Sequence, residues 1–156
     1  MKISIIRAIF LFCLALSAGA DTIGSMTVSG IVPELIHMSI SSSQIRLNLE
    51  SSTRDPITVS SVRVWSTCHW SIAIESKNKG FLENVEDPSE RIGYLFTFGA
   101  LTETPESLSS VWTSSVQDPT LKVGFDLPLN VQLLASDSNL IAGVYEDSLI
   151  INIQQL

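Results

Sequence analysis

The sequence predicts an all-β fold, an antiparallel sandwich of about 7–10 short strands. Short runs of residues alternate between apolar and polar side chains with a period of two. Clusters of Ser, Asn, Asp, Gly and Pro separate these runs, as turns separate the strands of a sandwich. Beyond the first twenty residues, no stretch has the 3.6-residue apolar period of an amphipathic helix.

The first twenty residues have the pattern of a secretory signal peptide. Lys2 and Arg7 make a positively charged start, residues 9–16 (IFLFCLAL) are apolar, and residues 18–20 are small. The apolar run is shorter than the roughly 20 residues that a membrane-spanning helix needs. We therefore predict cleavage after Ala20 and export to the periplasm, the cell surface or the medium, with a retained N-terminal anchor as the alternative.

Residues 21–156 are expected to form a single β-sandwich domain, because no linker or internal repeat divides them. Without Lys2 and Arg7, 7 basic residues (9 − 2) stand against 16 acidic ones, a net charge of −9. An acidic surface repels phosphate groups, so nucleic acid is not an expected partner. No later segment is long and apolar enough to span a membrane.

Strands are predicted in nine runs of this domain. In chain order they are residues 26–32, 38–40, 45–49, 57–64, 70–75, 81–82, 94–98, 123–133 and 142–154. Pro33 ends the first run, and Pro56 follows a polar turn after the third. The fourth run changes parity at Ser60 and Ser61, which predicts a β-bulge.

The fifth run places Trp70, Ile72 and Ile74 on one face, which predicts a core strand. The turn after it, SKNKG, ends in Gly80, which can adopt a positive φ. The sixth run restarts after this turn, and the seventh alternates cleanly through the aromatic stretch YLFTF. Residues 102–120 form a long Ser/Thr-rich stretch, predicted to hold a short strand or helical turn near Trp112 or to be the working loop.

The last two runs carry less regular signals. Pro128 interrupts the eighth run and favours an edge strand or a bulge there. Residues 142–154 are expected to pair within the chain's own sheet, with Gly143 making a tight reversal. Its apolar residues, among them Ile151, are expected to pack against the face that carries Trp70 and Ile72.

Residues that carry chemistry are sparse. The histidines are His37 and His69, and no Cys-x-x-Cys or His-x-x-x-His spacing supplies the three or four ligands of a zinc site, so no metal or cofactor is expected. His69 follows Cys68, but neighbours on a strand point to opposite faces and do not make a catalytic pair. Cys68 is the one cysteine of residues 21–156, so we expect it to be half-buried and free, with pairing between molecules as the alternative.

The carboxylates of the domain lie mainly in polar loops, where they are expected to be solvated. They include Glu83, Glu86, Asp87, Glu90, Glu103 and Glu106. No apolar surroundings that would raise a carboxyl pKa accompany them. No phosphate-binding glycine pattern or calcium-loop pattern is present either. The sequence therefore predicts a protein that is not an enzyme.

Two tryptophans are candidates for surface binding. Trp65 has the opposite strand parity to Val64, and Trp112 lies in the long loop. Exposed tryptophans stack on sugar rings or anchor protein interfaces, although both residues could instead cover the edges of the sandwich. A carbohydrate-binding or hydrolytic accessory domain that uses Trp112 and the acidic loops is therefore the alternative function.

Three motifs carry a resemblance to a known group of proteins. In residues 62–82 (VRVWSTCHWSIAIESKNKGFL), Trp70 begins a strand that leads into the pattern S-x-N-x-G-x-L. YLFTFG follows at 94–99, and residues 142–153 fit A-G-x-Y-x-D-x-L/V. Together they resemble the spore coat protein U and fimbrial-subunit group of secreted bacterial β-sandwiches. The chain departs from this group in its unpaired Cys68 and in its IQQL ending, which lacks a penultimate Tyr.

The resemblance implies an Ig-like, pilin-like sandwich that is an exported structural or adhesive subunit without enzymatic activity. In such subunits an open sheet edge accepts an extended segment of a neighbouring molecule. Met26, Val28, Gly30 and Val32 are spaced two apart, as a donor strand requires, and self-association or a surface assembly would follow. The alternative is a self-sufficient monomer in which residues 26–32 form the first strand.

Overall fold

The computed structural model of the chain describes residues 25–44, 47, 49, 55–120, 122–134 and 140–156. Val32–Leu156 forms one compact unit, and the described residues before it belong to another. The predicted signal peptide, the turns at 51–54 and 135–139, and most of the predicted strand at 45–49 lie outside the described residues.

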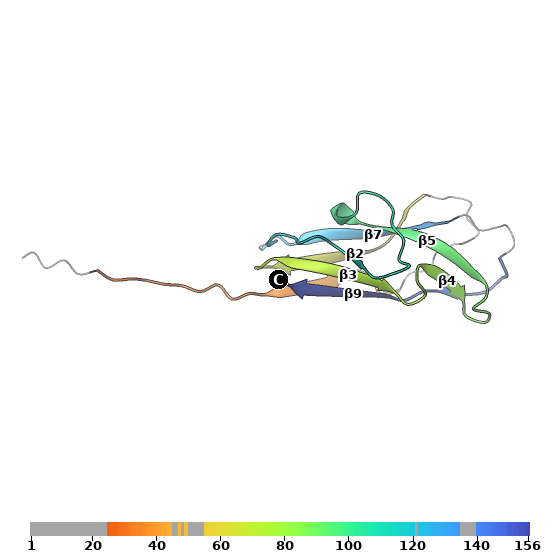
Figure 1. Ribbon diagram of the computed structural model, residues 1–156, viewed down its shortest axis with the longest axis horizontal. Helices are drawn as coiled ribbons and strands as arrows, with labels where there is room; N and C mark the ends of the chain where they lie inside the picture. The colour runs from red at the N-terminus through yellow and green to blue at the C-terminus, as the bar shows by residue number, and fades with distance from the viewer. Residues whose placement is uncertain (1–24, 45–46, 48, 50–54, 121, 135–139) are drawn as a thin grey trace, which may run out of the picture. The chain divides into compact units, whose positions relative to one another are not determined.

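The unit Val32–Leu156 is an all-β fold of two antiparallel sheets, which confirms the predicted class (Figure 1). The six-stranded sheet has the order β1-β2-β7-β5-β4-β8, and the three-stranded sheet has the order β6-β3-β9. The strands of the larger sheet are β1 (Ile36–Ile40), β2 (Ile57–Ser66), β4 (Phe81–Asn84), β5 (Arg91–Phe98), β7 (Phe125–Leu133) and β8 (Tyr145–Glu146). Those of the smaller sheet are β3 (Trp70–Ser76), β6 (Trp112–Thr113) and β9 (Leu149–Gln155), and the 3-10 helix η1 (Gly99–Leu101) follows β5.

The core fills the space between the sheets with alternate side chains of the long strands. In β3, Trp70, Ile72 and Ile74 are almost completely buried, as their parity predicts. Phe96 and Phe98 of β5 face them from the larger sheet and are fully buried. Among the described residues, no helix is long and apolar enough to span a membrane.

Two irregularities of the larger sheet have local causes. The register of β2 against β7 shifts between Thr58 and Ser60, which confirms the predicted bulge. The prediction that Pro128 marks an edge strand or a bulge is wrong on the first count, because β7 lies between β2 and β5. Ser61, which stands opposite Pro128, directs its backbone toward Ser41, the residue after β1. The Ser61 carbonyl accepts from the Ser41 N–H (2.9 Å), and the Ser61 N–H donates to the Ser41 hydroxyl (2.8 Å). The nitrogen of Pro128 therefore points away from β2.

On the other side of Pro128, no described strand lies opposite its nitrogen, so the missing N–H leaves no carbonyl of a neighbouring strand without a donor. The ladder of β5 with β7 ends at the pair Phe98↔Leu129, one residue before Pro128. Gly99 takes the chain away there with φ +52, and a Cβ on it would come within 3.2 Å of the proline ring. A proline is thus tolerated in a central strand because its neighbour has already turned off.

The terminal segment pairs within the chain, but not as one strand. Tyr145–Glu146 pairs with β4 of the larger sheet, and Leu149–Gln155 pairs with β3 of the smaller one. The chain changes sheets at Asp147 and Ser148. The expected packing against Trp70 and Ile72 is confirmed for β9, where Ile153 stands opposite Ile72.

The described residues before the sandwich form no strand. Residues 25–35 have no assigned secondary structure, and Met26, Val28 and Val32 are 87%, 82% and 77% exposed. A Cβ placed on Gly30 would meet nothing within 4 Å. The predicted strand over residues 26–32 is therefore wrong, and β1 is the first strand of the described residues.

Candidate functional site

The smaller sheet ends on one side in an unpaired edge of β9. The Trp70 N–H donates to the Gln117 carbonyl (3.1 Å), and the Ile72 carbonyl accepts from the Ser114 N–H (2.9 Å), so the backbone of both residues points away from β9. In an antiparallel ladder, the residues opposite them also point their backbone groups away from the shared side. The backbone N–H and C=O groups of Leu149, Ile151 and Ile153 therefore lie on the outer edge of β9, where no described strand pairs with them.

The larger sheet ends in an unpaired edge of β1 by the same pattern. The Leu35 carbonyl accepts from the Thr67 N–H, and the Ser41 N–H donates to the Ser61 carbonyl, both at 2.9 Å. These alternate residues face β2, so the backbone groups of Ile36, Met38 and Ile40 face away from it. No described strand pairs with this side of β1.

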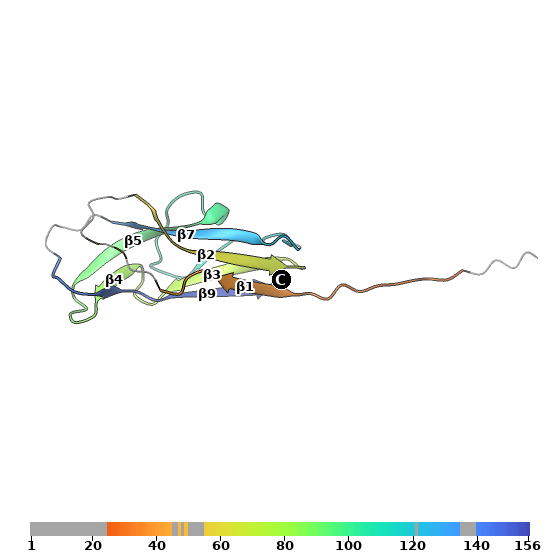
Figure 2. The ribbon, with the colours of Figure 1, turned by 180° about the vertical axis from the view of Figure 1, so that it is seen from behind.

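The two free edges carry apolar side chains that the sandwich covers only in part. Ile36 and Met38 of β1 and Leu149, Ile151 and Ile153 of β9 pack against the core but are incompletely buried, whereas Ile72 and Ile74 of the neighbouring β3 are fully buried. Figure 2 shows β1 and β9 running along the same side of the sandwich. We call Ile36–Ile40 and Leu149–Gln155 together the free-edge pair.

One end of the free-edge pair is tied together. The Gln155 side-chain amide donates to Glu34 Oε2 at 2.5 Å, and Glu34 lies just before β1. The Leu156 N–H also donates to the His69 carbonyl at 3.0 Å, which anchors the end of β9 to the start of β3. At the other end, where β9 begins, Asp147 makes the connections.

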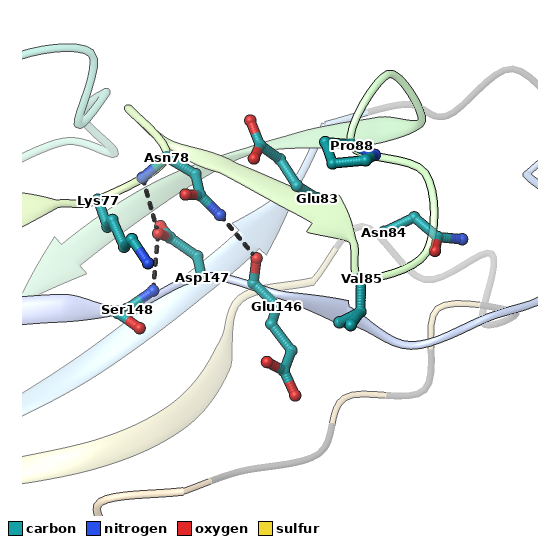
Figure 3. A pocket seen from close by; sticks show the side chains of 9 residues that line it. All are labelled: Lys77, Asn78, Glu83, Asn84, Val85, Pro88, Glu146, Asp147 and Ser148. Atoms are coloured by element: carbon teal, nitrogen blue, oxygen red, sulfur yellow. Dashed lines mark hydrogen bonds between the residues drawn. The ribbon is translucent and has the colours of Figure 1, made fainter.

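Asp147 holds the start of β9 to the end of β3 (Figure 3). Its Oδ1 accepts from the backbone N–H groups of Asn78 (3.0 Å) and Ser148 (2.7 Å), and its Oδ2 accepts from the Ser76 hydroxyl (2.6 Å). The Tyr94 hydroxyl of β5 also donates to Oδ2. One carboxylate thus joins both sheets where the chain crosses between them, and its hydrogen bonds to a charged acceptor are of the stronger kind.

Burial raises the pKa of the Tyr94 hydroxyl above its ordinary value, and the Asp147 carboxylate raises it further, because a phenolate there would lose its hydrogen bond and face a negative charge. The folded-state pKa therefore exceeds the unfolded value of about 10. The resulting stabilisation is complete below pH 10 and is lost as the pH rises above it.

Tyr94→Phe should consequently flatten the alkaline end of the stability curve. We expect the free energy of unfolding of the wild type to fall above about pH 10, and that of Tyr94→Phe to fall less, although the variant is weaker at neutral pH. Urea unfolding at a series of pH values measures both. Tyr145→Phe is the matched control, since its hydroxyl donates to the Ile141 carbonyl and not to a carboxylate. Equal alkaline slopes in wild type and Tyr94→Phe would contradict the assignment.

A shallow polar pocket of about 200 Å³ opens beside Asp147 (Figure 3). Its lining residues are Lys77, Asn78, Glu83, Asn84, Val85, Pro88, Glu146, Asp147 and Ser148. Asn78 donates from its side chain to the Glu146 carbonyl (2.9 Å), and the Asn84 Oδ1 accepts from the Glu86 N–H (2.9 Å). These polar groups hold turns in place. Within the part of the chain that the structure describes, no group of three or more His, Cys, Asp or Glu side chains is placed to hold a metal ion.

The two tryptophans lie in different surroundings. Trp112 of β6 is half-buried, with its ring edge-on to Phe96 (5.5 Å between centroids) and Phe98 (6.3 Å), which is core packing. Trp65 lies half-buried on the outer face of β2, with His37 opposite it at 5.5 Å and the Arg63 guanidinium 5.3 Å from its ring centroid. It covers Gly124, where a Cβ would come within 2.7 Å of its Nε1.

The remaining candidates each have their own partners. His69 lies 3.4 Å from an Asp118 carboxylate oxygen, while Cys68 is free, buried and 3.4 Å from the Ser66 hydroxyl. The loop carboxylates are exposed or half-buried, and Ser89 lowers the pKa of Asp87 by donating two hydrogen bonds to it. Of these residues, the structure brings His69 together with Asp118, and Asp87 together with Ser89.

The free-edge pair could not be located from the sequence, because alternation shows which side chains face inward but not which strands remain unpaired. The sequence also did not predict that the Asp147 carboxylate joins the two sheets, although the A-G-x-Y-x-D-x-L/V pattern contains this residue. Its partners Ser76 and Tyr94 lie 71 and 53 residues away in the sequence. In comparisons with known proteins, the chain matches no family model and no curated protein.

Proposed function

We propose that the chain is an exported, non-catalytic structural or adhesive subunit that assembles by strand addition. The free-edge pair of one copy accepts residues 26–32 of a second copy. The observation that carries this proposal is the coincidence of two unpaired edges with half-buried apolar side chains and an exposed apolar segment outside the strands.

The donor and the acceptor have matching chemistry. An added strand supplies hydrogen-bond partners to the outward backbone groups of Leu149, Ile151 and Ile153, and alternate side chains of the donor cover the core beneath. Met26, Val28 and Val32 have this alternation, and each is at least 77% exposed. Gly30 allows close approach at one position of the strand.

The gains and the costs of strand addition are of similar size. Full burial of one large aliphatic side chain contributes about 1.5–3 kcal/mol. Ordering the seven donor residues costs conformational entropy. Burial of three donor side chains and of the half-covered acceptor residues offsets only part of this cost. New backbone hydrogen bonds of about 0.5–1.5 kcal/mol each supply the remainder.

The carbohydrate-binding or hydrolytic alternative has less support. It depends on Trp112, and the ring of Trp112 packs edge-on against two core phenylalanines. Trp65 lies on the outer face of β2, and a glycan array that compares the wild type with Trp65→Ala would detect glycan binding there.

Deletion of residues 21–32 tests the proposed function. The full chain is expected to form ladders that resist SDS at room temperature, and the deletion is expected to abolish them while leaving a folded monomer, because no described strand includes these residues. Gel electrophoresis without heating and circular dichroism give the two readouts. Ladders that persist after the deletion, or a full chain that remains monomeric at high concentration, would overturn the proposal.

A further inference from the structure

A cluster of positive charge lies at one end of the otherwise acidic domain. Lys77 and Lys79 lie in the turn after β3, and Arg91 begins β5 beside them. They are three of the 7 basic residues (9 − 2) that remain without Lys2 and Arg7. With Asn78, Phe81 and Glu83 they line a shallow pocket of about 250 Å³, so three cations face one carboxylate. We call Lys77, Lys79 and Arg91 the basic turn.

None of these cations has an ion-pair partner among the described residues. The two ion pairs of the described chain join Arg63 to Asp126 and His69 to Asp118, both elsewhere. The Arg91 guanidinium lies over the Phe81 ring, 4.4 Å from its centroid, and does not pair with Glu83 opposite it. The basic turn therefore makes no ion pair with the described residues in a chain of net charge −7, although Lys77 also lines the pocket that holds Glu83, Glu146 and Asp147. An acidic partner is its complement.

The opposite end of the sandwich carries acidic groups near the start of β1. The end at which β3 starts and β9 finishes holds Glu34 and Asp118. Asp118 is attached there by its carbonyl, which accepts from Trp70 Nε1 (2.9 Å), and its side chain is 93% exposed. Glu34 follows Val32 by two residues, so these carboxylates lie at the root of the proposed donor segment. We call Glu34 and Asp118 the acidic base.

Strand addition brings these two ends together. The Gln155–Glu34 hydrogen bond ties the free-edge pair at the end where β9 finishes. The described strand pairs of the chain are all antiparallel, so a donor strand added antiparallel to β9 places its Val32 end, with the second copy behind it, beyond Leu149. Ser148 and Asp147 lie there, and Asp147 accepts a hydrogen bond from Asn78 of the turn that carries Lys77 and Lys79. The root of the donor copy thus arrives beside the basic turn of the acceptor.

We propose that the basic turn of each copy docks against the acidic base of the next and sets the rate and direction of assembly. This inference rests on the proposed strand addition, which places the two surfaces together. The partner of Lys77 and Lys79 is accordingly a second copy of this chain. Exposed charges at the rim of an interface act mainly on association rate and on salt dependence.

The test compares assembly of the whole chain with binding of a donor peptide. The double variant Lys77→Glu/Lys79→Glu of the full chain should form ladders about tenfold more slowly than wild type at ~0.01 M ionic strength. The difference should nearly vanish at ~1 M, where the Debye length is about 3 Å. A synthetic peptide of residues 21–32 lacks the acidic base, so its affinity for the full chain should be the same for wild type and double variant within about twofold.

A charge rescue identifies the partner surface. Adding Asp118→Lys to the double variant should restore most of the lost rate, whereas Glu103→Lys, which changes an exposed charge outside the acidic base, should restore none. The docking inference is overturned if the double variant assembles at the wild-type rate, if it also loses the peptide, or if both rescues act alike. A wild-type chain that neither forms ladders nor binds the peptide would instead overturn the proposed function, and the inference with it.

Discussion

Deletion of residues 149–156 is expected to unfold the isolated protein. The deletion removes β9, which pairs with β3 from Trp70↔Gln155 to Ser76↔Leu149. Among the described strands, β3 then pairs only with the two-residue β6, and the core is exposed along the edge that β9 covered. Three aliphatic side chains are lost from the core rim, each worth about 1.5–3 kcal/mol when fully buried. The loss is comparable with the net stability of a domain, about 5–15 kcal/mol.

Circular dichroism and urea unfolding measure the effect, and single substitutions in β9 give the matched comparison. Ile151→Ala, on the core side, should lower the free energy of unfolding by about 2 kcal/mol, toward the low end for buried isoleucine because its edge is open. Ile150→Ala, whose side chain is 50% exposed on the other face, should change it by less than about 0.5 kcal/mol. A truncated chain that remains folded and monomeric would show that β9 does not complete the domain's own core.

The substitution Val28→Asp is expected to abolish assembly without affecting the monomer. In the single copy Val28 is 82% exposed, so a carboxylate there costs nothing. In the proposed added strand the same side chain faces the core of the acceptor, where an unpaired carboxylate costs several kcal/mol. Each 1.4 kcal/mol lowers the association constant tenfold, so ladders should disappear at any practical concentration.

Ser29→Asp is the control, because it places the same charge one residue away on the solvent side of the added strand. Ladders should persist in this variant, and urea unfolding of the two monomers should be indistinguishable. If both variants assemble, or if neither does, the alternate side chains of residues 26–32 are not what the acceptor recognises, and the donor segment lies elsewhere.

Period-two alternation was enough to predict the class of fold and the faces of the strands. Trp70, Ile72 and Ile74 lie in the core as their parity requires, and Gly80 adopts φ +83 after β3 as the turn sequence indicates. These features depend on neighbours along the chain. They follow from the alternation of strand side chains and from the steric cost of a Cβ at positive φ.

Features that depend on partner strands could not be predicted in this way. Pro128 indicated an edge, yet β7 is central, because what matters is that β5 stops one residue earlier. Residues 142–154 were predicted as one run, yet Asp147 divides them between two strands. Ser76 and Tyr94, which lie on distant strands, donate hydrogen bonds to its carboxylate. The unpaired edges of β1 and β9 depend likewise on strand order, which alternation does not encode.

The pairing of β3 with β9 also governs when the domain can finish folding. About seventy residues of chain separate the two strands, and the closure of such a long loop is a slow, entropically opposed step. During synthesis β3 emerges long before β9, so among the described strands its backbone is paired only with the two-residue β6 until residues 149–155 become available. One backbone edge of β3 thus remains unpaired throughout that interval, and unpaired strand edges are sites where nascent chains aggregate. The order of strands therefore makes delayed completion an inherent property of this domain.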